Sequence, residues 1–144
     1  MADGDMELAL AVRELVRRAD VYRGERADAI GGVAVTDIVA LGHLFVQGPQ
    51  SPTELAARLH VTTASVTELV DRLEQRGWTS RGPHPHDRRR ILVSLTDTGR
   101  TLISETYQDL ALRLTPAFAA LTTDQQQAVM LFLRLAADGL ADGS

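Results

Sequence analysis

The spacing of apolar positions along the chain predicts a mostly helical protein. Near the start, apolar side chains recur every three or four positions and form one stripe about four turns long: Leu8, Val12, Leu15, Ala19 and Tyr22. Gly31-Gly32 interrupts this stripe. The largely apolar run of residues 36–45 then predicts a second, mostly buried helix that stops before Gly48-Pro49.

Two shorter helices are predicted next, joined by a tight turn. Ser51-Pro52-Thr53-Glu54 is typical of a helix start, with serine as the N-cap, proline in the first helical position and glutamate three residues after the cap. A turn at roughly residues 60–63 leads to another helix, whose expected buried side chains are Val66, Leu69, Val70 and Leu73. Gly77 is placed to end that helix in a left-handed conformation. The two helices together predict a helix-turn-helix.

A hairpin follows, and three adjacent arginines lie at its second strand. Residues 78–81 and the alternating run 91–96 predict two antiparallel strands, with residues 82–87 as a proline-stiffened loop between them. Arg88-Arg89-Arg90 stands where that loop enters the second strand, so we expect these residues near the loop tip. Two further helices are predicted, one after Thr96 and one capped by Thr122 or Thr123.

This order predicts a mainly α fold with a small β-hairpin (α+β), namely a winged helix-turn-helix. Such a fold suits DNA, because a helix fits the major groove and a hairpin beside it reaches the narrow minor groove, whose negative potential attracts arginine. The charge distribution agrees with this. The chain carries a net charge of -4, yet residues 52–100 hold eight arginines against six acidic residues, while the segments on either side each carry -3.

Composition excludes several other classes of protein. The chain has 144 residues, 44% of them hydrophobic, which is enough for a folded core. No run approaches the eighteen or so apolar residues of a membrane helix, and the acidic start MADGDMELALAV does not resemble a signal peptide, so we expect a cytoplasmic protein. The absence of cysteine excludes disulfides, thiolate metal sites and a thiol redox switch. No catalytic motif is present, so neither an enzyme nor a cofactor is expected.

The central segment, residues 69–99, resembles the signature of the MarR family of bacterial transcriptional regulators. The resemblance rests on Asp71-Arg72-Leu73-Glu74, on residues 81–89 (RGPHPHDRR) and on residues 95–99 (LTDTG), and the order of segments extends it over nearly the whole chain. It implies a single MarR-like domain over residues 1–144, with a winged helix-turn-helix lobe at about 36–98. It also implies a homodimer built from dimerisation helices at about 5–30 and 99–141, bound to a pseudo-palindromic operator in double-stranded DNA.

The candidates for DNA contact lie on the second helix of the pair and on the hairpin, or wing. A helical wheel turns several side chains outward, and the hydroxyls and amides of the first turn suit phosphate: Thr62, Thr63, Ala64, Ser65, Thr67 and Glu68. We expect Asp71 and Arg72 to hold this helix within its own lobe. The family resemblance implies that Asp87 orients Arg89, which enters the minor groove, with Arg88 and Arg90 as nearby phosphate partners.

Glu68 departs from the family pattern, which often has a basic residue there. The residues leave two interpretations open. The carboxylate can accept a hydrogen bond from a cytosine amino group in the major groove. The favoured alternative is an ion pair with Arg72 one turn along the helix.

Regulation by a small molecule is implied by the resemblance, which places an effector cavity between the dimerisation helices and the DNA-binding lobe. The candidate residues for a small aromatic effector are Tyr22, Asp37, Leu41, His43 and Phe45. For His43 in its apolar run, a satisfied core position is the favoured alternative. His84-Pro85-His86 offers two metal ligands, but with no cysteine and no carboxylates arranged around the pair we expect no metal site.

The leading hypothesis is therefore a homodimeric, sequence-specific DNA-binding regulator, a repressor released by a small-molecule effector. In this hypothesis residues 62–76 form the recognition helix in the major groove and residues 82–90 the wing in the minor groove. The alternative is a winged-helix protein-interaction module without DNA binding, favoured by the acidic net charge and by Glu68.

Overall fold

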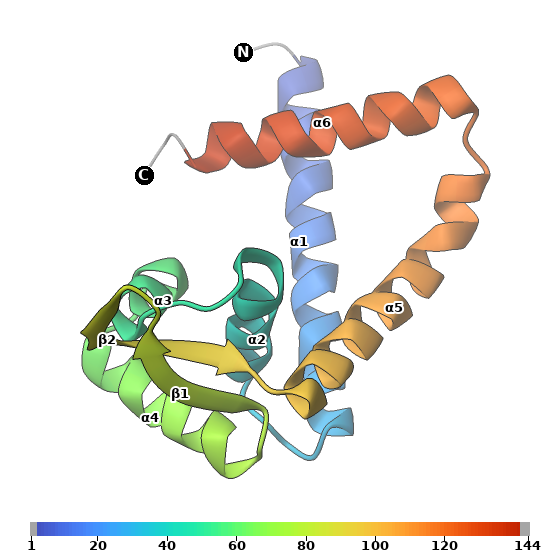
Figure 1. Ribbon diagram of the computed structural model, residues 1–144. Helices are drawn as coiled ribbons and strands as arrows, with labels where there is room; N and C mark the ends of the chain where they lie inside the picture. Colours follow the sequence, from blue (N-terminus) through green and yellow to red (C-terminus); the bar gives the residue numbers. More distant parts are fainter. Residues whose placement is uncertain (1–2, 142–144) are drawn as a thin grey trace. The chain divides into compact units, whose positions relative to one another are not determined.

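The computed structural model describes residues 3–141, which form six helices and one two-stranded hairpin (Figure 1). In chain order the elements are α1 (Asp3–Ala29), α2 (Val35–Gln47), α3 (Pro52–Leu59), α4 (Thr63–Gln75), β1 (Thr79–His84), β2 (Asp87–Leu95), α5 (Asp97–Ala119) and α6 (Thr123–Ala141). This confirms the predicted fold class. The chain divides into two compact units, one ending at Thr106 and the other beginning at Tyr107. A single domain over residues 1–144, whose ends lie outside the described residues, stays a prediction.

The long helix α1 carries the predicted apolar stripe but buries almost none of it. Leu8 and Leu15 are 50% and 56% exposed, and Ala27 is the one buried residue of this helix. Gly31 and Gly32 follow the helix with φ angles of 113° and 75°, a backbone conformation that glycine adopts at little cost. The predicted stripe lies on a helix, as expected; its members Val12, Ala19 and Tyr22 are half-buried, whereas Leu8 and Leu15 are exposed.

The start of α3 has the predicted capping box. The Ser51 hydroxyl accepts a hydrogen bond from the Glu54 backbone amide (3.2 Å), and the Glu54 carboxylate accepts one from the Ser51 amide (3.0 Å). The turn to α4 is one residue shorter than expected, because Thr63 already belongs to α4 and Thr62 is its N-cap. His60 takes a left-handed conformation (φ 54°) and so ends α3 sharply.

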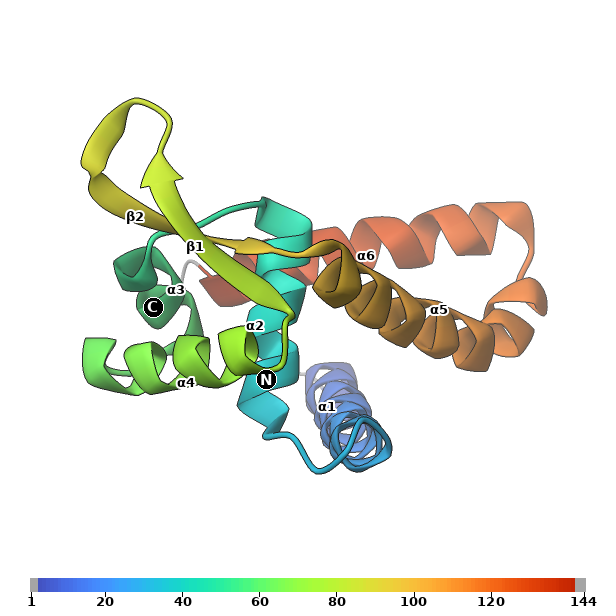
Figure 2. The same ribbon diagram turned by 60° about the horizontal axis from the view of Figure 1, so that its bottom comes forward.

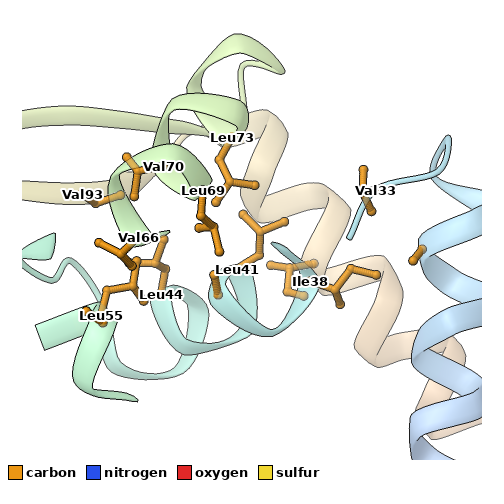
Figure 3. Close-up of a cluster of buried hydrophobic side chains, with 14 residues drawn as sticks. Val33, Ile38, Leu41, Leu44, Leu55, Val66, Leu69, Val70, Leu73 and Val93 are labelled. Carbon is orange, nitrogen blue, oxygen red and sulfur yellow. The ribbon is translucent and has the colours of Figure 1, made fainter. Parts of the chain in front are cut away.

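The core of the first unit lies where α2, α3, α4 and β2 meet (Figure 3). All four predicted inward residues of α4 are buried, each at most 3% exposed. They pack with buried side chains from the neighbouring elements, among them Leu41, Leu44, Leu55, Val93 and Ile103. Because the apolar face of α4 packs into this core, its polar face is exposed to solvent.

The hairpin is longer than the sequence predicted. Its two strands run to His84 and from Asp87, so the expected loop of residues 82–87 shrinks to a turn at Pro85-His86, and Trp78 lies outside the strand. Gly82 pairs with Leu92 and Pro83 with Ile91. Proline is tolerated in β1 because this strand pairs only with β2 in the two-stranded sheet, so its other edge is free and the missing N–H costs no ladder bond there.

The three arginines lie just after the turn, near the tip as expected, but they belong to an irregular part of β2 rather than to the loop. Pairing is regular from Thr79↔Leu95 to Pro83↔Ile91, and the next pair is His84↔Asp87. Residues 88–90 therefore have no paired residue on β1 and form a bulge. A bulge bends its strand and re-aims its side chains. The glycine and prolines of residues 82–85 suggested an unpaired loop. The unpaired residues are instead 88–90, on β2.

Candidate nucleic-acid interface

The outward face of α4 carries all the predicted contact residues of this helix, and each of them is exposed: Thr62, Thr63, Ala64, Ser65, Thr67 and Glu68. Hydroxyl groups organise its first turn. The Thr62 hydroxyl accepts from the Ser65 amide (3.1 Å) and donates to the Ser65 hydroxyl (3.0 Å). These bonds leave the amides at the very start of the helix free to face an anion such as phosphate.

Arg81 of β1 anchors the hairpin to the polar side of α4. Its guanidinium donates to the carboxylates of Glu74 (2.9 Å) and Asp71 (2.5 Å), and its backbone amide donates to Glu74 as well (3.0 Å). The sequence analysis missed this residue. A signal was available, since Asp71 and Glu74 share one face of the helix at a spacing of three. The contacts confirm that Asp71 acts within its own lobe.

Arg72 ties α4 to α2 through Asp37. The guanidinium of Arg72 lies 2.8 Å from the Asp37 carboxylate, which is almost fully buried (4% exposed), and this hydrogen bond raises the pKa of Arg72 above its usual value. The expected pair between Glu68 and Arg72 is therefore wrong. Arg72 reaches across to the buried acid instead, and Glu68 acts on it only through longer-range Coulomb attraction. Sequence spacing could not reveal a partner 35 positions away.

Short local bonds shape the wing. The Asp87 carboxylate accepts from the backbone amide of Arg89 (3.0 Å), which fixes the chain at the start of the bulge. Nδ1 of His84 accepts from the His86 amide across the turn (3.1 Å). Arg90 lies 3.4 Å from Glu54, whose pKa is lowered first by the Ser51 amide and then by this arginine. Within residues 3–141, the guanidinium groups of Arg88 and Arg89 have no acidic partner.

The N-terminal end of α4 and the tip of the hairpin lie toward the same side of the lobe, as Figures 1 and 2 both show. A groove of about 310 Å³ lies between the middle of α4, the start of α3 and the paired part of the hairpin; it is lined by Pro52, Thr67, Val70, Asp71, Arg81 and Ile91. The exposed face of α4 and the unpaired wing arginines are thus presented together. That is the arrangement a duplex with adjacent major and minor grooves requires.

The candidate effector residues take part in separate contacts. The Tyr22 hydroxyl donates to the Thr106 carbonyl (2.9 Å), Asp37 binds Arg72, and Leu41 is in the core. The half-buried His43 accepts a hydrogen bond from the Gln50 side chain through its carbonyl (3.2 Å), and the Arg100 guanidinium lies 5.8 Å from the centre of the Phe45 ring. Their role toward an effector stays a prediction.

Gln50 is a second residue that the sequence analysis missed. It is 3% exposed and exchanges two backbone hydrogen bonds with Val93 of β2, at 3.1 and 2.7 Å. The segment before α3 is thereby fastened to the hairpin. A glutamine inside Gly-Pro-Gln-Ser is typical of a linker, so no feature of a single sequence indicated this contact.

Two further findings concern metal ligands and membrane-spanning helices. In the part of the chain that the structure describes, no three histidine, aspartate or glutamate side chains gather as metal ligands would, and the His84 and His86 rings lie 5.9 Å apart between centroids. In the same part, no helix combines the length and apolar character needed to cross a membrane.

Comparison with known proteins identifies the family. Residues 34–91 match the sequence model of the MarR family. The transcriptional regulator YkoM of Bacillus subtilis is 32% identical over 105 residues, which cover 73% of this chain and 68% of YkoM. The transcriptional repressor YetL of the same organism is 44% identical over 55 residues, or 38% of this chain and 33% of YetL.

Among solved structures, a MarR family protein from Bacillus stearothermophilus has the same fold. Its TM-score is 0.83 at 20% identity, with 98% of this chain and 99% of that chain covered. These relatives are regulators of transcription rather than enzymes. With the winged helix-turn-helix in place and YkoM covered over two thirds of its length, the chain belongs to the MarR family of DNA-binding transcriptional regulators.

Proposed function

We propose that this protein is a homodimeric, sequence-specific repressor that a small-molecule effector releases from DNA in the cytoplasm. Helix α4, within residues 62–76, occupies the major groove, and the wing of residues 82–90 reaches the minor groove. The observation that carries the proposal is the bulge in β2, which presents Arg88 and Arg89 without acidic partners beside an exposed recognition helix. In a chain with a net charge of -4, two adjacent cations without acidic partners form a local positive patch, which favours an anionic partner.

The dimer is supported by apolar side chains that the single chain leaves uncovered. Helix α6 has no buried residue, and six of its large apolar side chains are 42% to 75% exposed: Met130, Leu131, Phe132, Leu133, Leu135 and Leu140. In α1, six more are 46% to 56% exposed: Met6, Leu8, Leu10, Leu15, Val16 and Val21. Patches of this size on a soluble domain mark an interaction surface. A second copy of the chain is the occupant that the family resemblance implies.

Repression and its relief rest on less specific support. The relative YetL is a repressor, and the same outcome is proposed here. An effector releases DNA only if it binds better to a dimer whose two recognition helices are not about one DNA turn, or roughly 34 Å, apart. The proposed contact residues for that effector remain those of α1 and α2 named above.

The test begins with selection of bound duplexes from random DNA at near-physiological salt. An inverted repeat with half-sites about one turn apart is the expected product, bound by a species of twice the 15.6 kDa chain mass. Arg89→Ala is expected to weaken this binding by about 1–3 kcal/mol. It should also reduce the slope of log affinity against log salt by about one, as should Arg88→Ala if that residue neutralises a phosphate.

Arg13→Ala is the matched control. Arg13 is exposed on α1, away from the recognition helix and the wing, and its removal changes the net charge by the same amount. Because α1 belongs to the proposed dimer interface, the mass of the Arg13→Ala complex is measured as well. If Arg13→Ala weakens binding as much as Arg89→Ala does, the wing has no special role. If the wild-type dimer selects no duplex, the winged-helix protein-interaction module becomes the better explanation.

A further inference from the structure

Glu68 differs from the other acidic residues around α4 because it forms no ion pair with an arginine. Asp71 and Glu74 share Arg81, and the buried Asp37 binds Arg72. Even Glu54, on the neighbouring helix, pairs with Arg90. Among residues 3–141, the Glu68 carboxylate has neither an ion pair nor a hydrogen bond, although Arg72 stands one turn away from it. Because Arg72 forms its ion pair with Asp37, the Glu68 carboxylate remains unpaired.

The direction of the Glu68 side chain follows from helix geometry. Side chains on an α-helix lean toward its N-terminus, so Glu68 leans over the residue four positions earlier. That residue is Ala64, whose single methyl group leaves space for the longer side chain. Helix geometry thus favours a Glu68 side chain that leans toward the N-terminal end of α4. This end of the helix faces the same side as the hairpin tip (Figure 2). On the proposed recognition helix, this places a carboxylate among the groups that approach DNA.

A carboxylate on such a helix weakens nonspecific binding, because the phosphates repel it. The affinity lost to this repulsion is recovered where a base supplies a hydrogen-bond donor to the carboxylate. In the major groove only cytosine N4 and adenine N6 donate; guanine presents the acceptors O6 and N7, and thymine presents the acceptor O4. Adenine is the poorer partner for an acceptor-only group, because its N7 acceptor lies beside N6 and repels the second carboxylate oxygen.

We propose that Glu68 reads cytosine at one position of each operator half-site, by accepting a hydrogen bond from the N4 amino group. This inference rests on the proposed function, since it requires α4 to lie in the major groove. Much of the discrimination comes from repulsion, because guanine and thymine both place acceptors opposite the carboxylate. Glu68 thus lowers the affinity for nonspecific DNA and increases the selectivity between operators.

The experiment repeats the duplex selection with wild type, Glu68→Gln and Glu68→Ala, and then measures affinities for the four bases at each half-site position. Wild type is expected to prefer cytosine about tenfold or more over guanine and thymine at one position. Glu68→Gln should move the preference there to adenine, because a glutamine amide pairs with adenine N6 and N7. Glu68→Ala should make the four bases nearly equal and strengthen binding to nonspecific DNA.

Glu105→Gln is the matched control, since it neutralises an exposed helical glutamate of α5 that lies outside the proposed DNA interface. It should leave the base preference at every position unchanged. A wild type that selects an inverted repeat, together with a Glu68→Ala variant that keeps every preference, would overturn the cytosine assignment and leave the proposed function standing. A wild type that selects no repeat would overturn both.

Discussion

Replacing Gly99 with alanine is expected to lower the free energy of unfolding by about 3 kcal/mol, at the upper end of the usual cost of inserting a methyl group into a packed site. Gly99 lies in the first turn of α5 and is buried. A Cβ atom at this position would fall well inside van der Waals contact with the carbonyl group of Trp78. The obstacle is backbone, so no side-chain rotation relieves it.

Hydrogen bonds hold both sides of this contact in place. The Trp78 carbonyl accepts from the Thr96 amide (3.0 Å), and the Thr96 hydroxyl donates to the Gly77 carbonyl (2.6 Å) while accepting from the Gly99 amide (3.1 Å). Thr96 thus joins the exit of α4 to the entry of α5. Relief of the clash would have to break one of these bonds, which supports a large cost.

Thermal unfolding followed by circular dichroism measures the effect, and a decrease in Tm of about 10 °C corresponds to it for a chain of this length. Gly24→Ala is the control. Gly24 is also helical, but a Cβ there meets no atom within 4 Å apart from its chain neighbours and the backbone of its own helix. Alanine at that site should preserve or slightly raise the stability, since it favours the helix. Equal losses in the two variants would contradict the steric explanation.

Local signals in the sequence predicted the frame of the molecule well. Capping of α3 by Ser51, the buried face of α4 and the stop at Gly77 depend on residues a few positions apart, and the structure confirms all three. The predicted bounds of the hairpin strands and loop were wrong, because a bulge is decided by which residues pair across two strands. A run such as Arg88-Arg89-Arg90 contains no local sign that it lacks partners on β1.

Long-range partners account for the other errors at the candidate site. The sequence analysis gave Arg72 the nearest acid along the helix, whereas the fold brings the buried Asp37 within 2.8 Å of it. A buried carboxylate gains more from a cation than an exposed one does, so Asp37 wins over Glu68 for this arginine. The same reason explains why Asp37, predicted as an effector contact, has a visible structural role between α2 and α4.

The ion pair of Arg72 and Asp37 gives the second large expected effect. Arg72→Ala should lower the free energy of unfolding by about 3 kcal/mol at pH 7, the low end of the range for breaking a buried ion pair, because the Arg72 side chain is 47% exposed and water reaches it. The exposed Arg58 on α3 is the control, and Arg58→Ala should change the stability by less than about 0.5 kcal/mol.

A second substitution identifies the cause of the Arg72→Ala loss. Without the arginine, the buried carboxylate of Asp37 keeps its charge but has no cation to offset its desolvation. Adding Asp37→Asn removes the buried charge and should recover most of the loss at pH 7. If urea unfolding at pH 7 instead showed that the two single changes are strictly additive, the loss would come from the packing of the arginine stem, and the charge of Asp37 would not be its cause.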